Sequence, residues 1–201
     1  SFDVYRFTAC LTAFAILFQI VLGALTRLTG SGLACPDWPL CYGLWFPTPT
    51  ELAGLEIDYS FFQVMLEWTH RFNAAAVVAP LVLAISVFAW FERKLSPVNW
   101  RISAAALVTL IIQGGVGGLT VFDRNSSWSV AVHLGLASIL LALVVSAIRL
   151  KDVSYSDWSS RASTKACRFV AALGVLVLIT MVSGAIVAKS GATLSCVGWP
   201  L

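Results

Sequence analysis

The two histidines of this chain, His70 and His133, each lie a few residues inside an apolar stretch long enough to cross a bilayer. If the chain alternates between the two membrane sides, both stretches run in the same direction, which puts the imidazoles at similar depth near one membrane face. Histidine is a standard axial ligand of haem iron, and a low-spin site takes one imidazole from each side of the ring. The spacing therefore predicts a bis-histidine clamp for haem iron. For either residue alone, the alternative is a membrane histidine satisfied by a neighbouring carbonyl.

A carboxylate precedes the first histidine by three residues, in the run Glu67-Trp68-Thr69-His70-Arg71. Residues three apart share a helix face, so Glu67 is expected beside His70. There it would lie near the edge of a bound porphyrin, where it would accept a proton or stabilise developing positive charge. The alternative is a structural ion pair between Glu67 and Arg71, its neighbour four residues on.

The composition is that of an integral membrane protein. Hydrophobic residues make up 59% of the chain and charged residues 11%, with a mean hydropathy of +0.86. Five stretches reach the roughly 20 residues that a spanning helix needs, and the first reads as a retained helix rather than a cleaved signal. These stretches are residues 7–28, 62–91, 102–121, 128–150 and 169–188. The predicted fold is all-α: a four-helix transmembrane bundle plus the first helix of a second, repeated four-helix bundle.

The distribution of basic residues predicts the orientation, because Lys and Arg near helix ends are kept on the cytoplasmic side. An N-terminus inside places nine of the 13 Lys and Arg residues on that side. Arg27, Arg71 and Arg124 then lie outside, where they are candidate contacts for haem propionates or snorkel to lipid headgroups. No basic patch with interleaved aromatic residues suggests nucleic acid as a partner.

The predicted external loop, residues 29–61, carries two cysteines that bracket two prolines. Cys35 and Cys41 would face an oxidising compartment, which favours a small disulfide loop. The alternative is two unpaired thiols, and a zinc site is disfavoured because no histidine accompanies them. Cys10 and Cys167 lie in or beside apolar helices and are interpreted as structural residues.

The end of the chain repeats its beginning. A shift of 161 positions sets Cys196 on Cys35 and gives nine identities over 20 aligned positions without a gap. We therefore expect a four-helix haem-binding unit over residues 1–150, a cytoplasmic linker over 151–168, and the truncated start of a second copy over 169–201. Doubling the repeat predicts a whole protein of roughly 320 residues.

A fainter repeat lies within the first unit. A shift of 94 positions sets Gln113 on Gln19 and Gly117 on Gly23. This relation predicts that the two halves of the unit are related by an axis along the membrane normal, passing between the histidines. The glycines of the third stretch allow a neighbouring backbone or a flat macrocycle to come close, although ordinary helix packing explains them equally well. These glycines are Gly114, Gly115, Gly117 and Gly118.

The sequence from Gly23 to Cys41, together with Glu67-Trp68-Thr69-His70-Arg71 and Val132-His133-Leu134, resembles haem A synthase over essentially the whole chain. The resemblance implies eight helices in two four-helix halves, each with a histidine pair. It implies that the N-terminal half receives the substrate haem O and that the C-terminal half holds a haem b cofactor. The implied reaction oxidises a porphyrin methyl group to a formyl group, giving haem A for terminal oxidases.

The resemblance also assigns residue roles. His70 and His133 match the axial ligands of the N-terminal haem, and Glu67 matches the catalytic glutamate. Cys35 and Cys41 match external cysteines that form a disulfide or take part in redox exchange, and Cys196 matches one member of a second pair. The departure is the histidine pair of the second half, and with it the haem b site, which this sequence lacks.

The resemblance further implies partners and a location. The expected partners are haem O, haem O synthase, oxidase assembly factors and the lipid bilayer, with pairing of two copies left open. The expected location is a bacterial inner membrane or the mitochondrial inner membrane. Two other functions compete: a bis-histidine electron carrier resembling cytochrome b, and a membrane protein that passes haem on unchanged.

Overall fold

The computed structural model describes residues 3–150 and 165–189, with the backbone alone described for 165–170 and 188–189. Within these ranges all regular structure is helical, apart from a single antiparallel bridge between Cys41 and Leu44. The all-α prediction is therefore confirmed. In chain order the elements are α1 (Val4–Leu28), α2 (Pro49–Leu52), α3 (Phe61–Asn73), the π-helical turn η1 (Ala74–Val78), α4 (Ala79–Phe91), α5 (Pro97–Phe122), α6 (Ser127–Leu150) and α8 (Lys165–Lys189).

In the part of the chain that the structure describes, four continuous helices are long and apolar enough to cross a membrane: α1, the run from α3 to α4, α5 and α6. Two of them begin several residues before the predicted apolar stretch. At α1 the Asp3 side chain caps the helix by accepting the N–H of Arg6. At α5 the helix begins at Pro97, whose fixed φ suits the first helical position. Hydropathy finds the part of a helix in lipid, whereas capping decides where the helix starts.

The fifth predicted helix is present as α8, with an apolar part over Ala171–Val187. It packs against α6, where Gly135 faces Leu178 and Val182. Residues 151–164 and 190–201 lie outside the described residues, and Cys196 is among them. The linker over 151–168 and the second repeat over 169–201 therefore stay predictions.

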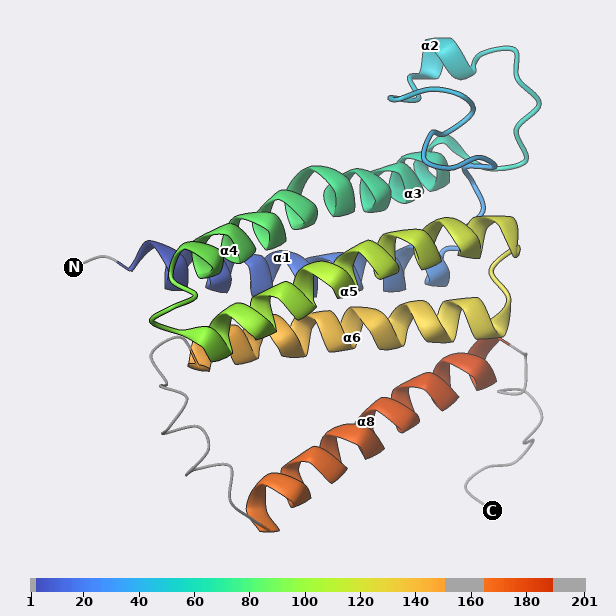
Figure 1. Cartoon of the computed structure of the whole chain (residues 1–201). Helices are drawn as coiled ribbons and strands as arrows, with labels where there is room; N and C mark the ends of the chain where they lie inside the picture. The colour runs from blue at the N-terminus through green and yellow to red at the C-terminus, as the bar shows by residue number, and fades with distance from the viewer. Residues whose placement is uncertain (1–2, 151–164, 190–201) are drawn as a thin grey trace, which may run out of the picture.

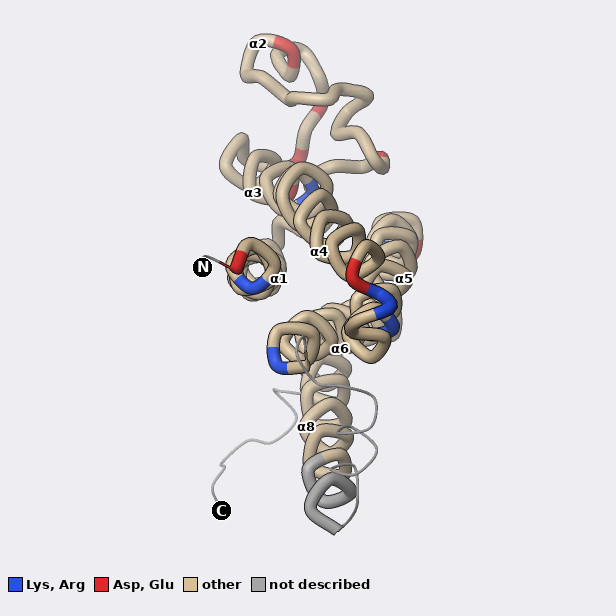
Figure 2. The backbone as a smooth tube through the Cα atoms, turned by 60° about the vertical axis from the view of Figure 1, so that its left-hand side comes forward, with Lys and Arg blue, Asp and Glu red and all other residues tan. Residues whose placement is uncertain are grey.

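The spanning helices alternate in direction, as the sequence predicts (Figure 1). The C-terminal ends of α1 and α5 and the N-terminal ends of α3 and α6 gather at one end of the bundle, beside the loop that carries α2 (Figure 1). The charged residues of the α4–α5 turn and the C-terminal end of α6 lie at the opposite end, with the N-terminus (Figure 2). Both histidines are consequently in the half of the bundle nearest the α2 loop.

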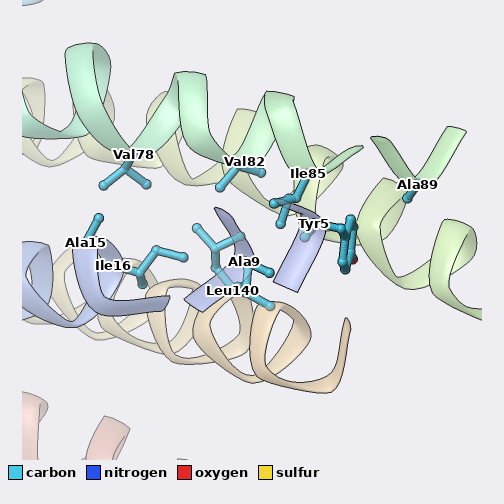
Figure 3. Packing of buried hydrophobic residues seen from close by; sticks show 11 residues of the cluster. Tyr5, Ala9, Ala15, Ile16, Val78, Val82, Ile85, Ala89 and Leu140 are labelled. Carbon is cyan, nitrogen blue, oxygen red and sulfur yellow. The ribbon is translucent and has the colours of Figure 1, made fainter. Parts of the chain in front are cut away.

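The core of the bundle lies toward the end that carries the N-terminus. Ala9, Ile16, Val82 and Ile85 bring α1 and α4 together, and Leu140 adds α6 (Figure 3). The outer faces are also apolar, with many large exposed side chains on every spanning helix. An apolar core inside an apolar exterior is the arrangement of a helix bundle in lipid, where backbone groups are satisfied within each helix. The chain is a multi-pass membrane protein.

The span that carries His70 contains a wider turn immediately after α3. In η1 the N–H of Ala79 bonds to the carbonyl of Ala74, five residues earlier. The next residue, Pro80, has no N–H, and its ring would collide with the carbonyl four residues before it in a regular helix. The wider turn accommodates the proline without ending the span, and such turns are frequent at functional sites.

Candidate functional site

The imidazole of His70 projects from α3 onto α1. A Cβ atom on Gly23 would lie 3.0 Å from Cε1 of the ring, so the missing side chain makes room for it. Gln19, one turn earlier on α1, places its Nε2 atom 3.0 Å from Nδ1 and 3.2 Å from Nε2 of His70. The same amide donates to the His70 carbonyl oxygen at 2.9 Å. α1 therefore supplies both the space for the ring and its polar neighbour.

His133 lies in the same surroundings on the other helix pair. A Cβ atom on Gly117 of α5 would lie 3.0 Å from Cε1 of His133, and Gln113 Nε2 lies 3.3 Å from its Nε2. The relation at a shift of 94 positions is thus a repeated geometry, in which a glutamine and a glycine on α1 or α5 flank the histidine of α3 or α6.

The ends of α1 and α5 repeat in the same way. The N–H of Ser31 donates to the carbonyl of Thr26 at 2.8 Å, and the N–H of Asn125 donates to that of Thr120 at 2.7 Å. Each helix ends in a residue with positive φ, Gly30 at 68° in α1 and Arg124 at 49° in α5. These are two copies of one helix-terminating motif. Both histidines therefore sit against their partner helices at the same distance from the helix end.

The second histidine has an incomplete set of hydrogen bonds. Nδ1 of His133 and Oε1 of Gln113 are buried and have no hydrogen-bond partner in the described part of the chain. Buried polar atoms are ordinarily satisfied, so an unpaired ring nitrogen and an unpaired amide oxygen mark this position as a candidate functional site. α5 also leaves open space at Gly114 and Gly115, which have nothing within 4 Å of an added Cβ. Two half-buried imidazoles in matched surroundings are a donor set that fits an iron porphyrin.

Glu67 is buried, with 5% of its surface exposed, and both of its oxygens are bonded. Oε1 accepts from Arg71 at 2.6 Å and Oε2 accepts the N–H of Cys35 at 2.8 Å. Arg71 also donates to the carbonyls of Cys35, Asp37 and Leu40 at 2.9, 2.5 and 2.6 Å. The predicted alternative of a Glu67–Arg71 ion pair is therefore correct, and the pair also ties the external loop to α3.

The two loop cysteines form a disulfide. Cys35 and Cys41 are fully buried in a small core with Leu52 and Val64. The predicted disulfide is confirmed, and the alternative of two unpaired thiols is wrong. Cys10 is free and lies on the exposed face of α1, so it takes no part in the core.

Asp37 shapes the disulfide loop. Its carboxylate accepts the N–H groups of Tyr42 and Gly43 at 2.6 and 2.8 Å, which supports the positive φ of 56° at Tyr42. Burial, and then the nearby acidic groups, raise the pKa of the Tyr42 hydroxyl above its ordinary value. On the other side of the loop, the Trp38 ring lies 3.0 Å from the Cβ position of Gly118 on α5. The loop therefore reaches from α3 to α5.

The three candidate propionate contacts lie in different places. Arg71 is beside the site, and its terminal nitrogens bond to Glu67 and to loop carbonyls. Arg27 extends toward α8, 3.5 Å from the carbonyl of Ala185. Arg124 is exposed in the turn between α5 and α6. Only Arg71 is in direct contact with the residues of the site described above.

Sequence reasoning did not assign a role to the glutamines or to Asn73. Asn73 donates to Oε1 of Gln19 at 2.7 Å and so fixes the amide that contacts His70. The signal that would have found the glutamines is the shift of 94 positions, because it pairs Gln19 with Gln113. No such signal exists for Asn73, since the residue three after His133 is Leu136.

The sequence model of one family, described as cytochrome oxidase assembly protein (COX15-CtaA), matches residues 6–201. The chain belongs to this family. Among curated proteins, it is 29% identical to "Heme A synthase" of Geobacillus kaustophilus, over 98% of this chain and 60% of that protein. It is 28% identical to "Heme A synthase" of Alkalihalophilus pseudofirmus, over 95% of this chain and 62% of that protein.

A third relative of the same name, from Bacillus pumilus, is 32% identical over 70% of this chain and 42% of its own length. The chain thus spans about three fifths of the first two relatives. No solved structure matches it significantly.

Proposed function

We propose that this chain binds haem O between His70 and His133 and takes part in oxidising one ring methyl to the formyl group of haem A. The observation that carries the proposal is the repeated geometry in which a glutamine and a glycine flank each histidine. Family membership and relatives named heme A synthase support the same reaction. The iron porphyrin supplies redox reactivity when bound, and the protein supplies orientation and local charge.

In this proposal two successive two-electron oxidations, whose electrons pass to an external oxidant, take the methyl group through the alcohol to a geminal diol. The diol loses water to give the aldehyde. Glu67 lies one turn from His70 on α3, where its carboxylate would stabilise positive charge that develops at the reacting carbon. Its bonds to Arg71 and to the Cys35 N–H keep the carboxylate in place. The Cys35–Cys41 disulfide shapes the loop that presents these groups. The resemblance to haem A synthase places a haem b cofactor in the C-terminal half of the whole protein. We propose no described residue of this chain as its ligand.

The decisive experiment is pigment extraction after expression with a source of haem O. Hydroxymethyl or formyl haem is the expected product. Unmodified haem in the extract would instead favour an electron carrier or a haem-handling protein. Replacing Glu67 with Gln should leave the haem bound and lower the yield of oxidised product, and an undiminished yield would refute its role.

The axial ligands are tested by spectroscopy of the purified chain. His70→Ala and His133→Ala should each remove the low-spin haem spectrum, because a six-coordinate low-spin iron needs both imidazoles. Spectra identical to that of the unchanged chain would rule out ligation by these residues.

We also propose that the N-terminus is cytoplasmic and that the disulfide loop faces the opposite side of a bacterial or mitochondrial inner membrane. The basic residues at the N-terminal end of the bundle support this orientation (Figure 2). A disulfide in the loop agrees with an oxidising compartment. Haem O synthase and oxidase assembly factors are the proposed protein partners.

A further inference from the structure

The disulfide loop carries an aromatic surface that continues onto α3. This surface consists of Trp45, Phe46, Trp68 and Phe72. Phe46 meets the Trp68 ring edge-on at 4.7 Å between centroids, and Phe72 stacks on it at 4.9 Å. The indole N–H of Trp68 donates to the carbonyl of Trp45 at 2.7 Å. Trp45 is nevertheless 80% exposed, and Phe46 and Phe72 are each 51% exposed. A contiguous exposed apolar patch of this kind marks an interaction surface.

The aromatic surface lies near the level where lipid headgroups meet acyl chains. The span that begins at Phe61 has 31 residues, which is about 46 Å of helix, whereas the hydrocarbon core of a bilayer is about 30 Å thick. A centred span therefore leaves about 8 Å, or roughly five residues, outside the core at each end. Trp68 follows Phe61 by seven residues, or about 10 Å. The loop residues that contact Trp68 thus reach the boundary of the core.

The surroundings of the loop leave lipid as the neighbour of this surface. The loop leans out on the side of α3 that faces away from the rest of the bundle (Figures 1 and 2). α8 packs against α6, across the bundle from α3 (Figures 1 and 2). The aromatic surface is therefore continuous with the outer, lipid-facing side of the α3–α4 span. Tryptophan is enriched at this level of a membrane because its ring is apolar and its N–H is polar.

The charges of the loop indicate what kind of lipid contact this is. The sequence has no Lys or Arg between Arg27 and Arg71, so the loop has no cation with which to attract anionic headgroups. Its exposed acidic residues, among them Glu51 and Glu56, belong in water. Contact with the bilayer must then come from apolar rings, and uncharged lipid is sufficient for it.

We propose that Trp45 and Phe46 insert into the headgroup region at the α2 end of the bundle and anchor the disulfide loop to the bilayer. The partner is the lipid surface itself. Anchoring holds the loop against α3, where the N–H and carbonyl of Cys35 bond to Glu67 and Arg71. The anchor does not depend on bound haem, so it is tested separately from the proposed function.

The test is photo-crosslinking of the full chain in vesicles of phosphatidylcholine. The photoreactive residue p-benzoylphenylalanine replaces Trp45 in one variant. In the matched control it replaces Glu56, an exposed acidic position of the same loop. Irradiation joins the benzophenone to a neighbouring C–H group. Mass spectrometry of the loop peptide should show a phospholipid adduct for position 45 and none for position 56.

Three results would overturn the inference. Absence of a lipid adduct at position 45 would place the loop tip in water, and equal adducts at both positions would remove any special role of the aromatic surface. A crosslink from position 45 to a second copy of the chain, without lipid, would make the surface an interface between copies. In native membranes, a crosslink to another protein in place of lipid would likewise assign the surface to a protein partner and contradict the anchor.

Trp45→Ser provides a second readout that needs no artificial residue. Because most of the Trp45 side chain is exposed, its loss removes little packing within the protein. We expect protease to cleave within residues 36–60 about tenfold faster in vesicles, since a large apolar side chain loses its burial in lipid and the loop opens more often. Trp128→Ser, at a position 70% exposed in the first turn of α6, is the matched control and should leave loop cleavage unchanged. Equal cleavage of Trp45→Ser and the unchanged chain would contradict the anchor.

Discussion

At the scale of single residues, Arg71 makes four side-chain hydrogen bonds that join α3 to the disulfide loop. It neutralises a buried carboxylate and donates to three loop carbonyls, so it replaces the water that these groups would otherwise need. A buried ion pair adds little net stability, but removing one partner leaves the other charge unpaired. Arg71 has one ion pair, but loss of its side chain would also leave three loop carbonyls without their donor.

Arg71→Met should destabilise the chain by about 3–5 kcal/mol, because Glu67 and three carbonyls lose their partner. Thermal unfolding in detergent measures this loss. Arg149→Met, an exposed position in the last turn of α6, is the matched control and should change stability by less than about 0.5 kcal/mol. Equal unfolding temperatures for the two variants would show that the Arg71 network is not structural.

Four glycines of the site regions divide into two classes by the space beside them. Gly23→Ala and Gly117→Ala should push the imidazoles of His70 and His133, because the new Cβ would lie 3.0 Å from each ring. We expect lower haem content per chain and a weaker low-spin spectrum. Gly114→Ala and Gly115→Ala have open space, so they should keep the haem and gain about 0.5–1 kcal/mol from helix propensity. Equal haem content in all four variants would contradict the role of Gly23 and Gly117 in making room for the imidazoles.

At the scale of elements, the disulfide loop and α3 fold as one unit. The loop core contains Cys35, Cys41 and Val64, and on its outer side Trp68 of α3 donates to the carbonyl of Trp45 at 2.7 Å. Phe46 and Phe72 flank the Trp68 ring at centroid distances of 4.7 and 4.9 Å. Residues of the loop thus contact α3 at Val64 and at Trp68.

Replacing both loop cysteines with Ala should lower stability by about 2 kcal/mol, as expected for a short closed loop. Cleavage by protease within residues 36–60 should become faster, since the loop core around Leu52 and Val64 loses its cross-link. Cys10→Ala, at an exposed position on α1, is the control and should leave both measurements unchanged. The prediction fails if the double variant resists protease as well as the unchanged chain does.

At the scale of the whole molecule, the proposed orientation rests on charge and on the disulfide. The basic α4–α5 turn lies at one end of the bundle and the disulfide loop at the other (Figures 1 and 2). Alkaline phosphatase, which is active only after export, should be active when inserted at Gly54 and inactive when inserted at Leu95. Both positions are exposed in connecting segments. Activity at Leu95 alone would reverse the proposed topology.

The sequence alone was sufficient to predict the spanning helices, since a run of apolar residues is a local property. In lipid the backbone N–H and C=O groups of such a run must bond to one another, and a helix achieves this within one segment. It was also sufficient for the Cys35–Cys41 pair and for the choice of His70 and His133 as candidates, because few polar residues occur at that depth. The early helix starts at Val4 and Pro97 were missed, because caps are polar and hydropathy does not detect them.

Only the tertiary structure decided which groups meet. The contact of Asn73 with Gln19, the four bonds of Arg71, and Trp38 over Gly118 join residues on different elements. Their distances depend on how the helices pack and rotate. A linear sequence carries periodicity and composition but not the relative placement of helices, so the support behind each histidine, and the difference between the two, is visible only in three dimensions.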